Sequence, residues 1–413
     1  MMGKFLNSLT LLMTFLLIGC ANSPKHEVIH DVEEEEPVIC HEIQLNSHNI
    51  MDFTEKNEIK KWELEAACKR IGDLGEIITV SPGSGLKKEE MDRLRDIAKN
   101  YDVEVPSINF QNTYDLSCSN SKEKRLQAFI DAANSNRKVI WAIRGGFGTE
   151  MLLADLNKIT PPNQKKTFIG FCDSTSINIF LYQNWGWRVI HAPVFMYLLN
   201  DGFSLNKFDR LLDILEGKLD AYDISPVKPL NRKAQSIKNE ISGTLTGGNL
   251  TLVESSLGTC WEIKTDNKIL FLEDAHERAG SIYRSLYHLK EAGKLDGVRA
   301  IILGTFLDGG SQQIVKDFLK RFANTLKDIP VYTTNQIGHG YHNAPIIYGA
   351  DATIKNGKMT IRVDHSYDLP KKLKSSENIS KISETIPAEN VSDKEASVPN
   401  AGFGITKENT VVL

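Results

Sequence analysis

The chain has 413 residues, of which 41% are hydrophobic and 25% are charged, and its net charge at pH 7 is -4. This length exceeds that of one ordinary domain and predicts two domains with flanking tails, and the composition is typical of a soluble globular protein. The slightly acidic balance, without a basic stripe, excludes the electrostatic signature of a nucleic-acid-binding protein, so we expect no nucleic-acid partner.

The first 20 residues have the pattern of a signal peptide. Residues 1–4 carry a positive charge, and residues 5–18 are apolar but too short for a spanning helix. The stretch ends on Leu17-Ile18-Gly19-Cys20, which resembles the lipobox of bacterial lipoproteins; the alternative is a plain secretory signal with a chance cysteine. The lipobox predicts lipidation of Cys20 and a membrane anchor in the cell envelope, facing the periplasm. Because no aspartate follows Cys20, the pattern favours the outer membrane.

The segments next to the globular part are polar. Residues 21–56 contain an acidic run at 31–36 and predict a flexible tether, and residues 367–413, rich in Ser, Lys, Glu and Asn, predict a disordered tail. Of the six cysteines, five remain when Cys20 is set aside. Because five is an odd number, at least one thiol should stay free or pair between molecules.

Strands and helices alternate in the first half of the globular part. In chain order we expect a helix at 58–70, a strand at 76–82, amphipathic helical stretches at 87–100 and 126–133, and strands at 138–143, 167–171 and 187–190. This alternation predicts an α/β domain over residues 57–208 with a mainly parallel sheet.

The second half has a different character. Residues 209–241 are charged and contain Pro226 and Pro229, which predicts a linker or crossing segment. Residues 242–366 predict a second domain of mixed sheet and helices. Its expected strands lie at 268–272, 297–303, 352–354 and 359–363, and its expected helices at 281–292 and 313–326.

Cys172 lies between an expected strand and an expected helix. Residues 167–171 are β-branched and aromatic, and the small polar residues Asp173, Ser174 and Thr175 precede an apolar helical run. A side chain at such a sharp turn is exposed beside the first N–H groups of a helix, which is the logic of a nucleophile elbow and favours a thiolate. The alternative is a buried structural cysteine.

Three other stretches place polar groups at expected strand ends or in glycine-rich loops. They are RGGFG at residues 144–148, LED at 272–274 and GHGYH at 338–342. A thiol nucleophile needs a base and a carboxylate that orients it, and His339 and Glu273 could supply both. Separately, each has a plain alternative, a solvated strand end for Glu273 and an exposed loop histidine for His339. A metal site at His339 and His342 lacks a third ligand at suitable spacing, so we expect no metal.

Several long motifs occur in a characteristic order between residues 77 and 363. They are RGGFG, GFCDST, GTLTGGNLTLVESSLGT (243–259), KILFLEDAHE (268–277) and IGHG (337–340). In this order they resemble the LD-carboxypeptidase family, serine peptidases that include muramoyltetrapeptide carboxypeptidases and microcin C self-immunity peptidases. The resemblance implies an N-terminal α/β domain, a C-terminal domain of mixed sheet and helices, and an active site between them.

The resemblance also implies roles for individual residues. Cys172 stands where the family has its serine nucleophile, Glu273 matches the triad glutamate and His339 the triad histidine. The backbone N–H groups of Gly146 and Asp173 would form the oxyanion hole. For Arg144, contact with the substrate carboxylate and a structural role that holds the loop are both open.

The implied reaction is hydrolysis of the amide between an L-centre and a terminal D-amino acid, with release of D-alanine from murein tetrapeptide. It needs no metal or organic cofactor, its partner is a peptidoglycan stem peptide, and family members commonly form homodimers. The cysteine leaves three outcomes open: a working nucleophile, a weakened or repurposed enzyme, and a protein that only binds. The alternative functions are cleavage of a peptide-nucleotide antibiotic and binding to the wall without turnover.

Overall fold

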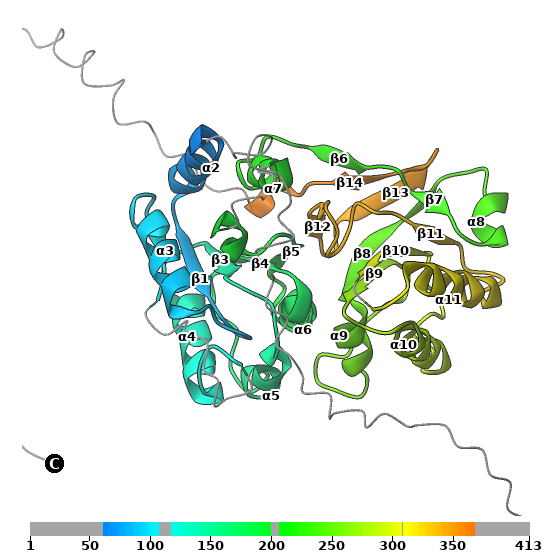
Figure 1. The fold of residues 1–413 in the computed structure, drawn as a ribbon, viewed down its shortest axis with the longest axis horizontal. Coiled ribbons are helices and arrows are strands. Elements are labelled where there is room, and N and C mark those ends of the chain that lie inside the picture. Colours follow the sequence, from blue (N-terminus) through cyan, green and yellow to red (C-terminus); the bar gives the residue numbers. More distant parts are fainter. Residues whose placement is uncertain (1–60, 107–116, 200–205, 308, 368–413) are drawn as a thin grey trace, which may run out of the picture. The chain divides into compact units, whose positions relative to one another are not determined.

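The computed structural model describes residues 61–106, 117–199, 206–307 and 309–367. These residues form two β-sheets with helices packed against them (Figure 1). The predicted signal peptide, the lipidation site Cys20, the tether and nearly all of the predicted tail lie outside the described residues.

The first sheet has six strands in the order β12-β5-β4-β3-β1-β2. The strands from the first half of the chain are parallel to their neighbours, as the alternating pattern predicted. They are β1 (Ile77–Val80), β2 (Val103–Glu104), β3 (Val139–Ala142), β4 (Thr167–Gly170) and β5 (Arg188–His191). Strands β1, β3, β4 and β5 are buried along their whole length, which explains the continuous apolar or β-branched runs of β1, β3 and β4.

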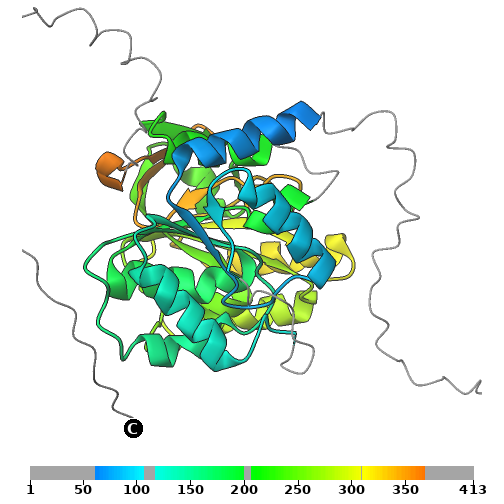
Figure 2. The ribbon, with the colours of Figure 1, turned by 90° about the vertical axis from the view of Figure 1, so that its left-hand side faces the viewer.

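Helices cover this sheet, and Figure 2 shows α2, α3 and α4 together on the side that faces the viewer. The helices of this half are α2 (Lys61–Leu74), α3 (Lys88–Lys99), α4 (Lys122–Asn134), α5 (Leu153–Leu156), α6 (Thr175–Phe180) and α7 (Asn206–Leu215). Helix α3 buries Met91, Leu94 and Ala98, one face of a 3.6-residue period. It begins with a capping contact in which the Lys87 backbone N–H donates to Glu90 Oε2 at 3.0 Å.

The second sheet has eight strands in the order β6-β14-β13-β8-β9-β10-β11-β7. The central strands β8 to β11 are parallel and the outer strands are antiparallel, so the predicted mixed sheet is confirmed. The strands are β6 (Ala221–Ile224), β7 (Lys228–Pro229), β8 (Ile241–Asn249), β9 (Lys268–Ala275), β10 (Ala300–Leu307), β11 (Val331–Thr333), β13 (Asp351–Lys355) and β14 (Lys358–Arg362). The helices of this half are α8 (Arg232–Ser236), α9 (Leu250–Ser255), α10 (Ala279–Glu291) and α11 (Gln312–Thr325).

The segment 209–241, predicted as a linker or crossing segment, is structured. It contains most of α7 together with β6, β7 and α8, and its two strands form the two edges of the second sheet. The prediction missed them because edge strands are short and tolerate charge and proline, as β7 (Lys228–Pro229) does. Strand β8 was also missed, since Gly243, Gly247 and Gly248 weaken its strand pattern.

Strand pairing and a hydrogen bond connect the two halves, in addition to the covalent chain. Strand β12 (Ile346–Ile347) follows the central strands of the second sheet in sequence, yet it pairs antiparallel with β5 of the first sheet. At another contact, the Asn249 backbone N–H at the end of β8 donates to Thr175 Oγ1 at 3.0 Å. The start of α6 therefore lies against the end of β8.

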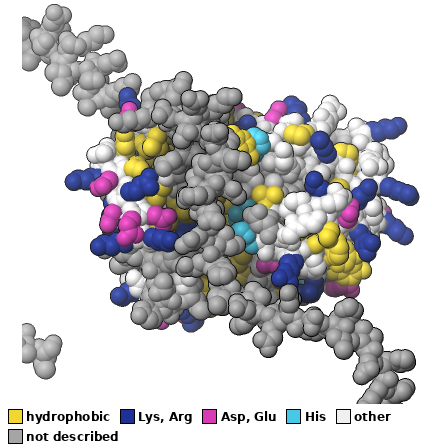
Figure 3. Space-filling model, viewed as in Figure 1, with side chains coloured by type: hydrophobic (Ala, Val, Ile, Leu, Met, Phe, Trp, Pro, Cys, Tyr) yellow, Lys and Arg dark blue, Asp and Glu magenta, His cyan; other side chains and the backbone are white. Residues whose placement is uncertain are grey.

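The surface of the described part carries mixed charges. Figure 3 shows lysine and arginine side chains spread over the visible face among acidic and uncharged ones, without a continuous basic stripe in the described part of that face. None of the helices within the described ranges has both the length and the apolar character needed to cross a bilayer.

Candidate active site

Cys172 lies at a strained turn between β4 and α6. Phe171 is extended, Cys172 has φ 63°, and a short 3₁₀ turn over Cys172–Ser174 leads into the helix. A non-glycine residue in the left-handed region is strained and has to be held there by its surroundings. Gly170 makes room for this turn, since a Cβ at residue 170 would lie 2.7 Å from Ser174 Cβ. The chain therefore forms the strand-turn-helix geometry of a nucleophile elbow, with the thiol half-buried.

The RGGFG turn lies against this elbow. A Cβ on Gly145 would lie 2.7 Å from Cys172 Cβ and 3.2 Å from Cys172 Sγ, so only glycine lets the two segments approach so closely. Ser84 holds the turn, since its N–H donates to Gly145 O at 3.1 Å and its Oγ accepts from Phe147 N–H at 3.2 Å. Within the described residues the exposed Gly146 N–H has no acceptor. The predicted oxyanion donor is thus free to bind a ligand.

Asp173 connects the elbow to the same turn. Its buried carboxylate accepts hydrogen bonds from the N–H and Oγ1 of Thr149, the residue after RGGFG, at 3.0 and 2.5 Å. Burial raises the pKa of Asp173 to about 6, against the lowering effect of the Thr149 hydrogen bonds. The Asp173 side chain is therefore structural, whereas its backbone N–H remains the predicted second oxyanion donor.

His339 and Glu273 are 66 residues apart in sequence and are in contact, with His339 Nδ1 2.7 Å from Glu273 Oε2. Glu273 is fully buried inside β9, which runs on past the predicted strand end at Leu272. The loop that carries His339 passes close to it because residue 338 is glycine: at φ 109°, a Cβ there would lie 2.9 Å from Glu273 Oε2. The Gly340 N–H donates to Thr305 Oγ1 at 3.2 Å and holds the other side of the loop.

The charges of this pair favour a protonated imidazole. Burial by itself would lower the pKa of His339, but the Glu273 carboxylate and the Cys172 side chain outweigh it and raise this pKa to about 11. Burial raises the pKa of Glu273, and the charge of His339 opposes that shift. The surroundings of His339 thus stabilise its imidazolium form, as the predicted role of His339 as a base requires.

His191 was missed in the sequence because it ends a buried strand and belongs to none of the motifs. Its imidazole is fully buried and packs against Phe171 and Phe271, with ring centroids 5.0 and 5.2 Å away. Neither of its ring nitrogens has a hydrogen-bond partner among the described residues. Burial, and secondarily the charge of His339, lowers the pKa of His191 to about 3, so this imidazole stays neutral. On its other side Phe171 contacts His339, with centroids 4.4 Å apart.

Two other predicted groups lie apart from the Glu273–His339 contact. Arg144 donates from Nη1 to Gly85 O at 3.1 Å, which is the loop-holding contact of the structural alternative; its role toward substrate stays a prediction. His342 is exposed and lines a separate cavity beyond the His339 loop.

Four cysteines lie in the described ranges, and their surroundings differ. Cys68 and Cys118 are buried, Cys260 is exposed and Cys172 is half-buried. Burial raises the pKa of the Cys68 thiol to about 11. Because Cys68 and Cys118 are buried, the rate at which a thiol reagent modifies Cys172 is best compared with the rate for the exposed Cys260.

The two halves of the chain match the models of the two domains of one protein family. Residues 77–192 match the model of the LD-carboxypeptidase N-terminal domain, and residues 242–354 match that of the LD-carboxypeptidase C-terminal domain. The chain belongs to the LD-carboxypeptidase family.

Relatives of this LD-carboxypeptidase family member have carboxypeptidase names. A carboxypeptidase homologue from Rickettsia conorii is 38% identical over 283 residues, covering 68% of this chain and 88% of the homologue. The murein tetrapeptide carboxypeptidase of Pseudomonas aeruginosa is 28% identical over 256 residues, covering 57% of this chain and 79% of the relative. The protein is therefore an enzyme of the carboxypeptidase type.

Solved structures share the fold of this family member. The muramoyltetrapeptide carboxypeptidase from Oxalobacter formigenes has a TM-score of 0.57 at 24% identity, covering 69% of this chain and 97% of that one. The Microcin C7 self immunity protein, in its wild-type apo state, has a TM-score of 0.58 at 18% identity, covering 70% and 96%. At these identities the likeness concerns the fold alone.

Proposed function

We propose that this protein is a cysteine-dependent LD-carboxypeptidase that removes the terminal D-alanine from murein tetrapeptide. One observation carries the proposal. Cys172 lies at a strained elbow, its side chain helps to raise the pKa of His339, and His339 Nδ1 is held by the buried Glu273 carboxylate at 2.7 Å. The murein tetrapeptide carboxypeptidase among its relatives supports the substrate class.

In the first half of the reaction, His339 takes the proton of Cys172 and the thiolate sulfur attacks the carbonyl carbon of the scissile amide. Glu273, which accepts from Nδ1, stabilises the imidazolium and leaves Nε2 to exchange the proton with the sulfur. The imidazolium then gives its proton to the leaving nitrogen, the C–N bond breaks, and D-alanine leaves with a free amine. The shortened peptide remains as a thioester on Cys172.

In the second half, His339 accepts a proton from a water molecule, whose oxygen attacks the thioester carbonyl. The C–S bond breaks, the sulfur recovers its proton from the imidazolium, and the peptide leaves with a new carboxylate. In both halves a negative oxygen develops, and the N–H groups of Gly146 and Asp173 are the donors proposed to bind it. The approach of Gly145 to Cys172 Sγ supports this assignment, because it brings the RGGFG backbone to the reacting atoms.

The test is mass spectrometry of the purified protein, freed of residues 1–20 and incubated under reducing conditions with murein tetrapeptide. The wild-type protein should release D-alanine, Cys172→Ala should lose turnover by several orders of magnitude, and Cys172→Ser should retain or raise it. Full activity in Cys172→Ala would show that the nucleophile is another group. Release by Cys172→Ser alone would mean that the native cysteine silences the site or serves another substrate.

We also propose that the enzyme works at the envelope membrane, facing the periplasm and anchored through lipid on Cys20. The motif Leu17-Ile18-Gly19-Cys20 supports this location, and the location would place the enzyme beside peptidoglycan. Intact mass of the protein recovered from membranes is the measurement. The proposal requires an acylated N-terminal Cys20 that disappears, together with membrane attachment, in Cys20→Ala.

A further inference from the structure

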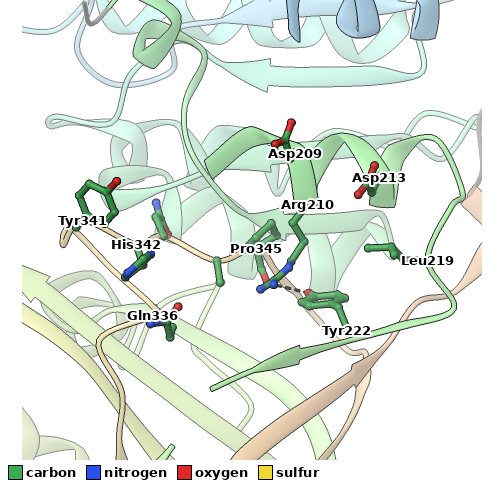
Figure 4. A pocket seen from close by; sticks show the side chains of 11 residues that line it. Asp209, Arg210, Asp213, Leu219, Tyr222, Gln336, Tyr341, His342 and Pro345 are labelled. Carbon is green, nitrogen blue, oxygen red and sulfur yellow. Dashed lines mark hydrogen bonds between the residues drawn. The ribbon is translucent and has the colours of Figure 1, made fainter. Parts of the chain in front are cut away.

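A cavity lies beyond the loop that holds His339. It has a volume of about 470 Å³, and its walls come from α7, from Leu219 and Tyr222, and from the loop segment Gln336 and 341–345 (Figure 4). The loop therefore has two sides. Residues 338–340 face Glu273 and Thr305, and the residues that follow line this cavity.

Among the described residues that line this cavity, one charged side chain has no ion-pair partner, and that side chain is the cation Arg210. Arg210 extends from α7 toward the Tyr222 ring, with its guanidinium carbon 5.5 Å from the ring centroid (Figure 4). Within the described residues Arg210 has no carboxylate within salt-bridge distance. The nearby Asp223 is instead paired with Lys358 at 2.7 Å.

The acidic residues of the cavity lining are engaged elsewhere. Asp209 and Asp213 lie on the other side of α7 from the Arg210 guanidinium (Figure 4). Both pair with Arg70, at 3.3 and 2.6 Å. The guanidinium of Arg210 is thus available for an anionic ligand, which a planar two-donor group binds best as a carboxylate or phosphate.

A second observation points to a polar ligand. Asn343 lines the cavity and is only 4% exposed, yet neither its amide oxygen nor its amide nitrogen has a hydrogen-bond partner in the described part of the chain. A buried amide without partners destabilises a fold, and a purely structural position would be better served by an apolar side chain. Gln336 and the exposed His342 add further hydrogen-bonding groups to the same lining.

The cavity lies within reach of a peptide bound at Cys172. His342 follows His339 by three residues, and three residues span at most about 11 Å even when fully extended. A tetrapeptide whose last amide lies at Cys172 extends upstream by three residues, a similar length.

We propose that this cavity binds a second carboxylate of the peptide substrate, carried by a residue upstream of the scissile amide, through Arg210 and Asn343. The inference rests on the proposed function and names the part of the substrate that this site recognises. A carboxylate fits better than a phosphate, because one unpaired guanidinium and neutral amides match a single negative charge.

The test measures binding by calorimetry in the Cys172→Ala background, which separates recognition from turnover. Two tetrapeptides are compared, one with the upstream carboxylate free and one with it amidated. Arg210→Met, which keeps apolar contact with Tyr222 but removes the charge, should weaken binding of the free acid about 10- to 100-fold and leave the amide unchanged. Arg210→Lys should recover part of the loss, and Arg232→Met, an exposed arginine on α8, should change neither value.

Asn343→Leu separates recognition from structure. The leucine should keep or raise the melting temperature, because it removes an unpaired buried amide, while it weakens binding of the free acid. Equal affinities for acid and amide, undetectable binding of both, or stronger competition by adenosine monophosphate than by the free acid would each overturn the inference. D-alanine release by the wild-type protein is scored separately, so loss of the proposed function and loss of the carboxylate site are distinguishable.

Discussion

At the scale of single residues, the site depends on side chains held in unfavourable surroundings. Cys172 is held at φ 63°, Glu273 is buried inside a strand, and Oε1 of its carboxylate has no hydrogen-bond partner among the described residues. Such strain and incomplete hydrogen bonding are tolerated where chemistry needs a fixed geometry. His191 is a neutral imidazole that contacts Phe171, and Phe171 in turn contacts His339.

The raised pKa of His339 makes stability depend on pH. Its pKa is raised from 6.5 to about 11, so the folded state binds the proton more tightly than the unfolded chain does. The stabilising contribution is therefore fully present below pH 6.5 and is lost as the pH rises toward about 11. Urea unfolding of the wild type and of His339→Gln should show a difference in free energy that is largest at low pH and shrinks in this window. A difference that is constant across the window would contradict the charged Glu273–His339 pair.

At the scale of elements, glycines decide how closely the loops approach one another. The loop between β11 and β12 places His339 against β9 only because Gly338 has no Cβ. In the same way Gly145 lets the RGGFG turn lie against the elbow. Both close approaches therefore occur at glycines, where larger residues would prevent them.

Gly338→Ala should displace the His339 loop. Its Cβ would lie 2.5 Å from Thr305 Oγ1 and 2.9 Å from Glu273 Cβ, so kcat/KM should fall at least about tenfold, in addition to a backbone strain of about 1 kcal/mol. Gly258→Ala is the matched control, since Gly258 also has a positive φ of 73° but nothing lies within 4 Å of its added Cβ. Both should lose similar backbone stability, and only Gly338→Ala should lose activity. Equal activities in the two variants would show that the loop position does not depend on this contact.

At the scale of the whole molecule, the two halves share structure. Strand β12 completes the first sheet from the far end of the chain, and the hydrophobic core forms one continuous cluster that includes residues of both sheets. The described residues of both halves also belong to one compact unit by their internal contacts. We therefore expect the two sheets to unfold together.

Ile346→Asp tests this coupling. Ile346 is fully buried in β12, so a carboxylate there should cost about 3 kcal/mol or more and lower the melting temperature of a single calorimetric transition. Ile314→Asp is the control, because Ile314 is 52% exposed on α11 and should change stability by about 0.5 kcal/mol or less. Two separate transitions, of which Ile346→Asp shifts only one, would show that the halves fold independently.

Local patterns in the sequence were sufficient for the fold class and for most elements near the site. The β-branched run before Cys172, the small polar residues after it and the alternation of strands and helices are short-range signals, and each depends on residues within one or two turns of the chain. The family motifs singled out Cys172, Glu273 and His339 in the same way.

Only the tertiary structure decided which of these groups meet. Glu273 and His339 are brought together by the pairing of β9 with β10 and by the glycine loop over them, and nothing in either local sequence encodes that distance. His191, the edge strands β6 and β7, the return of β12 to β5 and the Arg210 cavity were missed for the same physical reason. Each is a contact between segments far apart in the chain, and its stability comes from packing in the folded protein rather than from the preferences of its own residues.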